Sequence, residues 1–123
     1  MPAPESEYNY NLKKRCFYFS VKIVNFINSI PNKKINYSMF DQLLRSATSI
    51  GANIVEAISA SSRKDFINYY QIALKSSNET KYWLCLIEKT IMKGNLEIKS
   101  FLSECIELSN IIGASVRKLK KDL

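Results

Sequence analysis

The sequence contains no histidine, and this absence removes several kinds of chemistry at once. Without an imidazole there is no Ser-His or Cys-His nucleophile pair, no histidine-ligated zinc and no Glu-x-x-His iron site. Glycine is scarce, with three in 123 residues, and neither a GxxxxGK[ST] nor a GxGxxG phosphate loop is present. The 11 acidic residues are scattered along the chain. We therefore expect a protein that is not an enzyme and that holds no metal and no cofactor.

Cysteines and long apolar runs are also sparse. The three cysteines, Cys16, Cys85 and Cys105, form no CxxC pair and have no regular spacing, which is typical of reduced, buried thiols. No stretch approaches the roughly 20 apolar residues of a membrane span, and the first residues lack the apolar core of a secretory signal. We expect a cytoplasmic protein that does not associate with a membrane.

The composition is that of a small globular protein with an excess of positive charge. Of the 123 residues, 46% are hydrophobic and 24% charged, which suits one folded domain. The 18 Lys and Arg outnumber the 11 Asp and Glu and give a net charge of +7, so nucleic acid is a partner to consider. We predict a single domain over residues 1–123, in which the polar, proline-containing residues 1–8 form a flexible lead.

Apolar residues recur every three or four positions through four segments, which is the spacing of amphipathic helices. We predict helices from near Tyr8 to Ser29, from about Met39 to Ile58 and from Arg63 to about Ile91, and a fourth that follows Asn95 and reaches Leu119. Because the connections are short, successive helices must run antiparallel. The expected fold is therefore all-α, an antiparallel up-down-up-down four-helix bundle.

Residues that start or stop helices fall at the predicted boundaries: Pro31, the pairs Ser38 with Asp41 and Ser62 with Asp65, Gly94 and Asn95. Proline disfavours helical geometry for the residue before it, and each serine–aspartate pair has the spacing of a capping box. Glycine adopts the left-handed conformation that ends a helix, and asparagine is a favoured N-cap. These local signals support the four boundaries independently of the apolar spacing.

The predicted second helix carries a polar stripe beside its apolar one. Its members follow helical spacing and all bear hydrogen-bonding groups: Gln42, Arg45, Ser49, Asn53 and Glu56. We interpret them as a polar seam that faces other helices, with an ordinary solvated face as the alternative. If the second and third helices form a hairpin turning near residues 60 and 61, Arg45 lies level with Ser76 and within one turn of Glu79. We predict an Arg45–Glu79 ion pair, within one chain or between chains.

The segment RSATSIGANIVEA at residues 45–57 resembles the protein family encoded in intervening sequences of bacterial large-subunit rRNA genes. Gln42, SRKDF at 62–66 and ALKSSNE at 73–79 extend the likeness over nearly the whole chain. The chain departs from the family at Ala57, where a glycine is usual, and at residues 74–75, where an Arg-Gly pair is common. The resemblance implies a four-helix bundle that assembles into ring-like pentamers. It also implies kinship with accessory proteins of diversity-generating retroelements, which join a reverse transcriptase and RNA.

The sequence also indicates self-association. The first predicted helix has a wider apolar stripe than one core face needs, because Phe17, Val21 and Val24 flank it. The second has small residues beside the polar seam that would permit close approach between chains: Ser46, Gly51 and Ala52. We predict a homo-oligomer from these patterns, whereas the number five comes from the resemblance.

Half of the 18 basic residues are expected at one end of the bundle, where the first helix starts, the second meets the third, and the fourth ends. We call these nine residues the basic pole: Lys13, Lys14, Arg15, Arg63, Lys64, Arg117, Lys118, Lys120 and Lys121. A helix C-terminus favours basic side chains, but Arg63 and Lys64 open a helix at its positive end, where an anion is favoured. We predict that this pole binds the phosphates of RNA or DNA with little sequence preference. Two alternatives remain: a solvated basic end, and a scaffold for a protein partner such as a reverse transcriptase.

Overall fold

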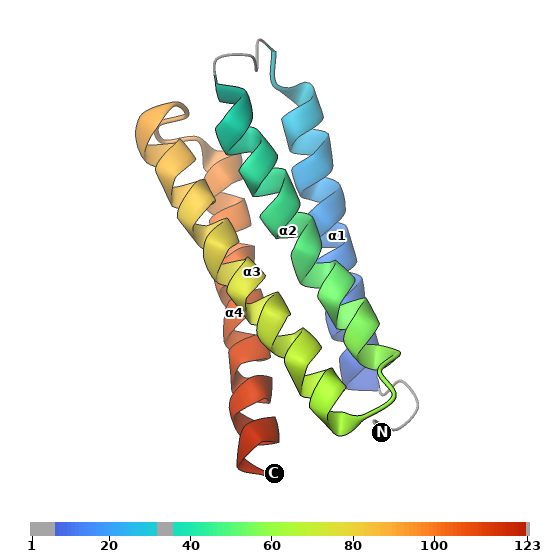
Figure 1. Cartoon of the computed structure of the whole chain (residues 1–123). Coiled ribbons are helices and arrows are strands. Elements are labelled where there is room, and N and C mark those ends of the chain that lie inside the picture. The colour runs from blue at the N-terminus through green and yellow to red at the C-terminus, as the bar shows by residue number, and fades with distance from the viewer. Residues whose placement is uncertain (1–6, 32–35, 123) are drawn as a thin grey trace.

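Four helices make up the computed structural model, which describes residues 7–31 and 36–122 (Figure 1). They are α1 (Glu7–Ser29), α2 (Tyr37–Ile58), α3 (Arg63–Thr90) and α4 (Leu96–Lys121). Each packs against the next in sequence, and α1 also contacts α4, though less extensively. The start of α1, the α2–α3 turn and the end of α4 lie at one end of the bundle. The predicted all-α up-down-up-down bundle is confirmed.

Most helix boundaries lie where the local signals place them. The Ser62 hydroxyl accepts a hydrogen bond from the Asp65 backbone N–H at 3.1 Å, and the Asn95 side chain accepts from the Ile98 N–H at 2.9 Å. Between α3 and α4, Gly94 adopts a left-handed φ of 72°. Its N–H donates to Glu88 at 2.9 Å, and this hydrogen bond lowers the pKa of that carboxyl group. Both caps are therefore confirmed. Gly94 does not cap α3, however: that helix ends at Thr90 with Ile91 as its C-cap, and the left-handed glycine belongs to the turn that leads to α4.

The start of α2 differs from the prediction. The helix begins at Tyr37, its N-cap residue Asn36 makes no side-chain capping hydrogen bond, and Ser38 lies inside the first turn. Asp41 accepts a hydrogen bond at 2.9 Å from Nε of Arg45, one turn further along. The predicted Ser38–Asp41 cap is wrong because α2 begins before Ser38, and the Asp41 carboxylate pairs with the guanidinium at i+4 instead.

The predicted flexible lead over residues 1–8 overlaps α1, which begins at Glu7. Residues 1–6 lie outside the part of the chain that the structure describes, as do residues 32–35 between α1 and α2. At the other end of α1, Ile30 has left the helix just before Pro31, as the sequence predicts.

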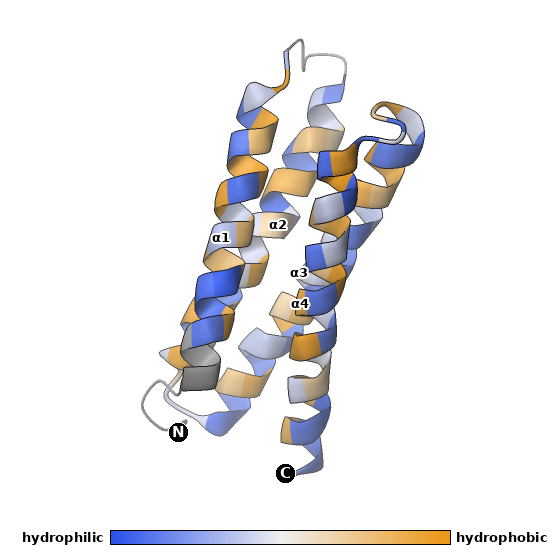
Figure 2. Cartoon of the chain, turned by 180° about the vertical axis from the view of Figure 1, so that it is seen from behind, coloured by the Kyte–Doolittle hydropathy of each residue, from blue (hydrophilic) through white to orange (hydrophobic). Residues whose placement is uncertain are grey.

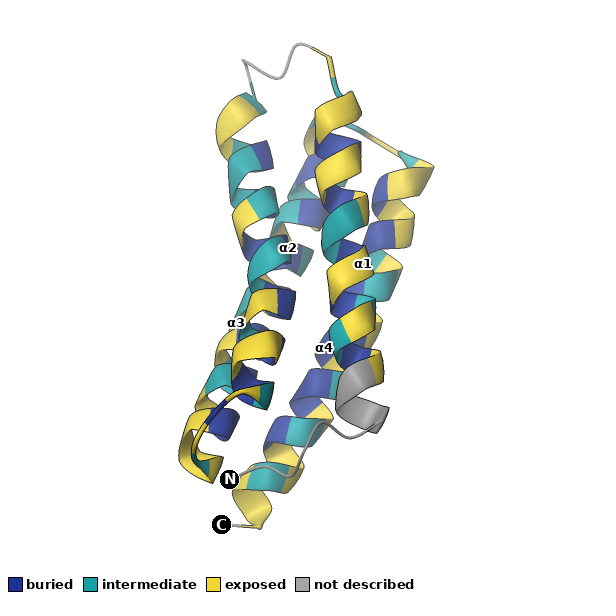
Figure 3. Cartoon of the chain, turned by 90° about the vertical axis from the view of Figure 1, so that its right-hand side faces the viewer, coloured by how far each residue is buried: buried dark blue, intermediate teal, exposed yellow. Residues whose placement is uncertain are grey.

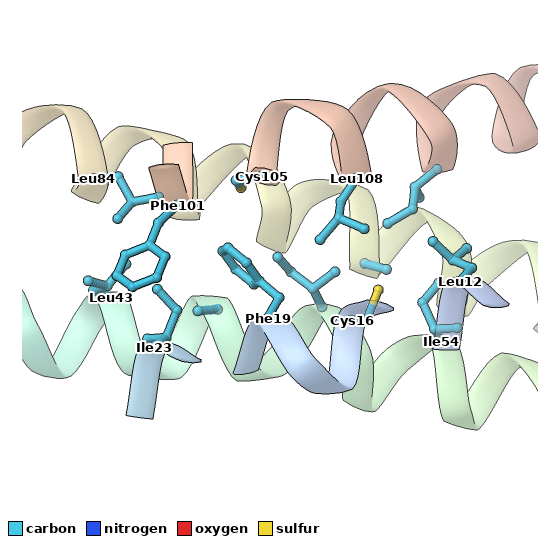
Figure 4. Packing of buried hydrophobic residues seen from close by; sticks show 14 of the residues in the cluster. Leu12, Cys16, Phe19, Ile23, Leu43, Ile54, Leu84, Phe101, Cys105 and Leu108 are labelled. Carbon is cyan, nitrogen blue, oxygen red and sulfur yellow. The ribbon is translucent and has the colours of Figure 1, made fainter. Parts of the chain in front are cut away.

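The apolar stripes of all four helices meet in one core, with the buried sides turned inward (Figures 3 and 4). Ile23 of α1, Leu43 of α2, Leu84 of α3 and Leu108 of α4 are all fully buried. Phe101 reaches from α4 toward α1 (Figure 4), where its ring meets those of Phe19 and Phe26 edge-on, with centroids 6.5 and 5.2 Å away.

The three cysteines are free thiols in different environments. Cys16 and Cys105 are buried, and burial raises the pKa of both to about 12. Because the thiolate is the reactive form, these two residues act as small apolar core residues. Cys85 is exposed on α3, which corrects the expectation that all three thiols are buried.

Candidate nucleic-acid interface

The basic pole of the folded chain is built mainly from two segments. The first is the opening turn of α3, with Arg63 and Lys64, and the second is the end of α4, whose residues from Arg117 onward are largely hydrophilic (Figures 1 and 2). All basic residues of these two segments are exposed, and none forms an ion pair among the described residues: Arg63, Lys64, Arg117, Lys118, Lys120 and Lys121. Asp65 and Asp122 are the acidic residues within the same turns. In the described part of the chain, the start of α3 and the end of α4 therefore present six cations without an ion pair and two carboxylates.

The three basic residues that α1 was expected to contribute behave differently from one another. Arg15 binds Glu104 at 2.8 Å and Glu107 at 3.1 Å, so it ties α1 to α4. The hydrogen bond to Glu104 is the main reason that the pKa of Arg15 is raised. Lys13 lines a groove between α1 and α2, while Lys14 is exposed. The structure thus places Arg15 in an interhelical contact that the sequence did not indicate.

A pocket of about 490 Å³ opens between the start of α3 and the end of α4, and Lys118 is the member of the basic pole that lines it. Its lining combines aromatic and aliphatic side chains with three polar ones: Phe66, Tyr70, Ala114, Ser115, Lys118, Leu119 and Asp122. The Phe66 and Tyr70 rings are stacked, with centroids 4.7 Å apart. The sequence analysis did not predict this pocket. The available signal was the aromatic pair at i and i+4, Phe66 and Tyr70, which begins two residues after Lys64.

The polar seam links α2 to α3 through small hydroxyl side chains. Ser76 donates to the Ser49 hydroxyl at 2.9 Å, and the Asn53 amide donates to the same hydroxyl at 3.0 Å. Thr80 donates to Ser46 at 3.0 Å in the buried interior. Ser49 and Asn53 therefore face the neighbouring helix as predicted, but Ser46 and Thr80 were not recognised as members.

The charged residues that were predicted to belong to the polar seam take no part in the hydrogen bonds between α2 and α3. The predicted Arg45–Glu79 ion pair is not formed within the chain: Arg45 binds Asp41 at 2.9 Å, and Glu79 accepts from the Trp83 indole at 3.3 Å. Arg45 directly precedes Ser46, and Glu79 directly precedes Thr80. Because successive residues of a helix are rotated by about 100° about its axis, the Arg45 and Glu79 side chains point away from the Ser46–Thr80 contact and toward solvent. Glu56 is also exposed, whereas Gln42 is half-buried.

We expect Arg45→Ala to leave the melting temperature of the protein unchanged. The Arg45 side chain is 73% exposed, and its contact with Asp41 is a surface pair within one helix. Thermal unfolding followed by circular dichroism measures the effect. A decrease that grows with protein concentration would contradict this expectation and indicate that Arg45 binds a second copy of the chain.

Two of the three small residues assigned to contacts between chains are used within the chain. A Cβ atom on Gly51 would lie 3.2 Å from the Cβ of Cys16, so this glycine allows α1 and α2 to approach closely. Ser46 is buried against Thr80. Ala52 is exposed, in a groove of α1 and α2 that Phe17 and Val55 also line, and these two side chains are 60% and 45% exposed. Exposed apolar side chains therefore line this groove of α1 and α2, and others lie on α3 and α4, such as Tyr82 and Leu96.

Other site types find no support in the described residues. Across residues 7–31 and 36–122, no group of three or more cysteine, aspartate or glutamate side chains could hold a metal ion. None of the helices in the same part of the chain combines the length and the apolarity needed to cross a membrane.

The fold and the basic end define this chain as a four-helix-bundle protein with a cationic surface at one pole. Residues 9–114 match the family described as 23S rRNA-intervening sequence protein, and the chain belongs to this family. The crystal structure of a protein of unknown function from the S23 ribosomal protein family of Bacteroides thetaiotaomicron is similar, with a TM-score of 0.81 and 38% identity. That similarity covers 89% of this chain and 97% of the other. Among proteins with curated descriptions, none matches. The family resemblance seen in residues 45–57 is confirmed.

Proposed function

We propose that this chain is a non-enzymatic assembly protein whose bundles associate into a homo-oligomer, with five copies suggested by the family resemblance. The oligomer binds the phosphate backbone of RNA or DNA through its basic poles. The observation that carries the proposal is the placement of Arg63 and Lys64, exposed and without an ion pair among the described residues, at the first turn of α3. Two cations at the positive end of a helix are unfavourable for the isolated chain, and a bound anion would reverse that effect.

The geometry of the pole supports phosphate binding over an unoccupied basic end. Arg63 and Lys64 lie at the same end of the bundle as the four cations of α4, from Arg117 to Lys121. A polyanion can therefore contact both segments at once. Such contacts release counterions and depend on phosphates, so binding should be sensitive to salt and insensitive to sequence.

Self-association would strengthen such binding. Phe17, Val24 and Val55 expose 60%, 36% and 45% of their surface on α1 and α2, and contact between copies would remove these apolar groups from water. Each added copy repeats the basic pole, and several linked poles bind one nucleic acid strand more tightly than a single pole does.

The proposal predicts salt-dependent binding by an oligomer. We expect light scattering to give a mass that is a multiple of 14.1 kDa. Fluorescence anisotropy with labelled RNA and DNA should show the logarithm of the affinity falling linearly with the logarithm of salt concentration, by about 0.7–0.9 per phosphate contacted. Oligonucleotides of scrambled sequence should bind equally well.

For each measurement, one result would contradict the proposed function. A monomeric mass at micromolar concentration would overturn the assembly, and an affinity unaffected by salt would overturn the phosphate contacts. A stable oligomer without affinity for either nucleic acid would favour the scaffold alternative, in which the bundle is an accessory subunit of a protein such as a reverse transcriptase.

A further inference from the structure

The pocket between α3 and α4 lies between the two cationic segments of the basic pole. Phe66, on its α3 wall, is one turn after Arg63, and Lys118 forms part of its α4 wall. A phosphate backbone that contacts Arg63 on one side and Lys118 on the other therefore passes across the mouth of the pocket. Its volume of about 490 Å³ is in the range of roughly 300–1,000 Å³ that is usual for small-ligand sites.

We propose that this pocket receives an unstacked base, so that the preferred ligand of the pole is single-stranded rather than duplex nucleic acid. The inference rests on the proposed phosphate binding and adds the class of strand to it. Bases in a duplex are paired and stacked, and they cannot enter such a pocket without being unpaired first. A single strand presents free bases together with its phosphates, which is the combination that cationic grooves with apolar platforms recognise.

The lining of the pocket suits a base better than a phosphate. Its inner wall is apolar, formed by the stacked Phe66 and Tyr70 rings together with Leu119. The two aromatic residues are only 7% and 1% exposed, so the wall is held in place by the core. Asp122 also lines the pocket. Its carboxylate repels phosphate but can accept a hydrogen bond from the amino group of a base, so phosphates are expected at the cations outside and a base inside.

The test uses the purified full-length chain with a labelled single strand of about 15 nucleotides and the duplex of the same sequence. Ala114→Leu places a branched apolar side chain in the pocket at an exposed position of α4. Asn110→Leu is the matched control, because it introduces the same side chain one turn earlier at an exposed position that does not line the pocket. Neither change alters the charge of the pole.

We expect the parent chain to bind the single strand about tenfold more tightly than the duplex, the size of effect expected from burying part of one base against the apolar wall of the pocket. Ala114→Leu should remove that preference and leave the duplex affinity unchanged, while Asn110→Leu should behave like the parent. A strand carrying 2-aminopurine should change its fluorescence on binding to the parent and to Asn110→Leu, but not to Ala114→Leu.

Three results would overturn the inference, and they are distinguishable. Equal affinities of the parent for strand and duplex, or identical behaviour of the two variants, would exclude the base pocket while retaining backbone binding. An oligomer mass altered by Ala114→Leu but not by Asn110→Leu would show that the pocket is occupied by a second copy of the chain. Absence of salt-dependent binding to both ligands would overturn the proposed function as well.

Discussion

Replacing Arg63, Lys64, Lys118 and Lys121 together by glutamine is expected to abolish RNA and DNA binding at moderate salt and to leave the oligomer intact. All four side chains are exposed and form no ion pair among the described residues, so their removal breaks no ion pair there. Glutamine is also a good helix former. If each cation contacts one phosphate, the slope of the logarithm of any remaining affinity against the logarithm of salt concentration should become shallower by about 3 to 3.5. Anisotropy titrations at several salt concentrations, together with light scattering, measure both effects.

A second variant with the same loss of charge separates the pole from the overall charge. Changing the exposed Lys75, Lys89, Lys93 and Lys99 to glutamine also lowers the net charge of +7 by four, but outside the pole. This control should retain most of the affinity. If this control loses as much affinity for nucleic acid as the pole variant does, binding depends on the net charge of the protein and not on one surface. Parental affinity of the pole variant at both low and moderate salt would show that the basic pole is not the site.

Phe101→Ala is expected to lower the free energy of unfolding by about 3–5 kcal/mol, the range for removing a buried phenylalanine. The ring is 5% exposed and contacts Phe19 and Phe26 edge-on, so it fills the core where α4 meets α1. Each edge-on contact adds about 0.5–1.5 kcal/mol beyond the burial of apolar surface. Because α1 and α4 pack less extensively than the other helix pairs, few other contacts could compensate. Chemical unfolding at fixed protein concentration measures the change.

Phe17→Ala makes the same chemical change at a phenylalanine that is 60% exposed on α1. We expect it to have little effect on the stability of a single bundle, because most of that ring already contacts water. If Phe101→Ala lowered the free energy of unfolding by less than about 1 kcal/mol, α1 and α4 would not pack through the Phe101 ring. A destabilisation by Phe17→Ala that depends on protein concentration would instead support contact between copies through α1.

The sequence by itself determined the number, order and direction of the helices. The apolar spacing places residues such as Ile23, Leu43 and Leu108 on one face of each helix, and that face is the buried one in the structure. Ser62 and Asn95 were identified as caps because capping depends on atoms only three residues apart. The protein family could also be inferred from the sequence, because residues 45–57 carry the motif of that family. The Ser38–Asp41 cap failed because α2 begins at Tyr37, so that Ser38 lies inside the helix and not at its end.

Only the tertiary structure decided how each helix is rotated about its axis against its neighbours. That rotation turns Arg45 toward solvent, buries Gly51 against Cys16 and brings Arg15 to Glu104, which is 89 residues away in the sequence. It also leaves the pocket beside Lys118 between α3 and α4. Spacing along one helix shows which residues share a face, but not which residues of another helix they contact. Those contacts depend on the simultaneous packing of all four helices, and the sequence of a single segment does not contain that information.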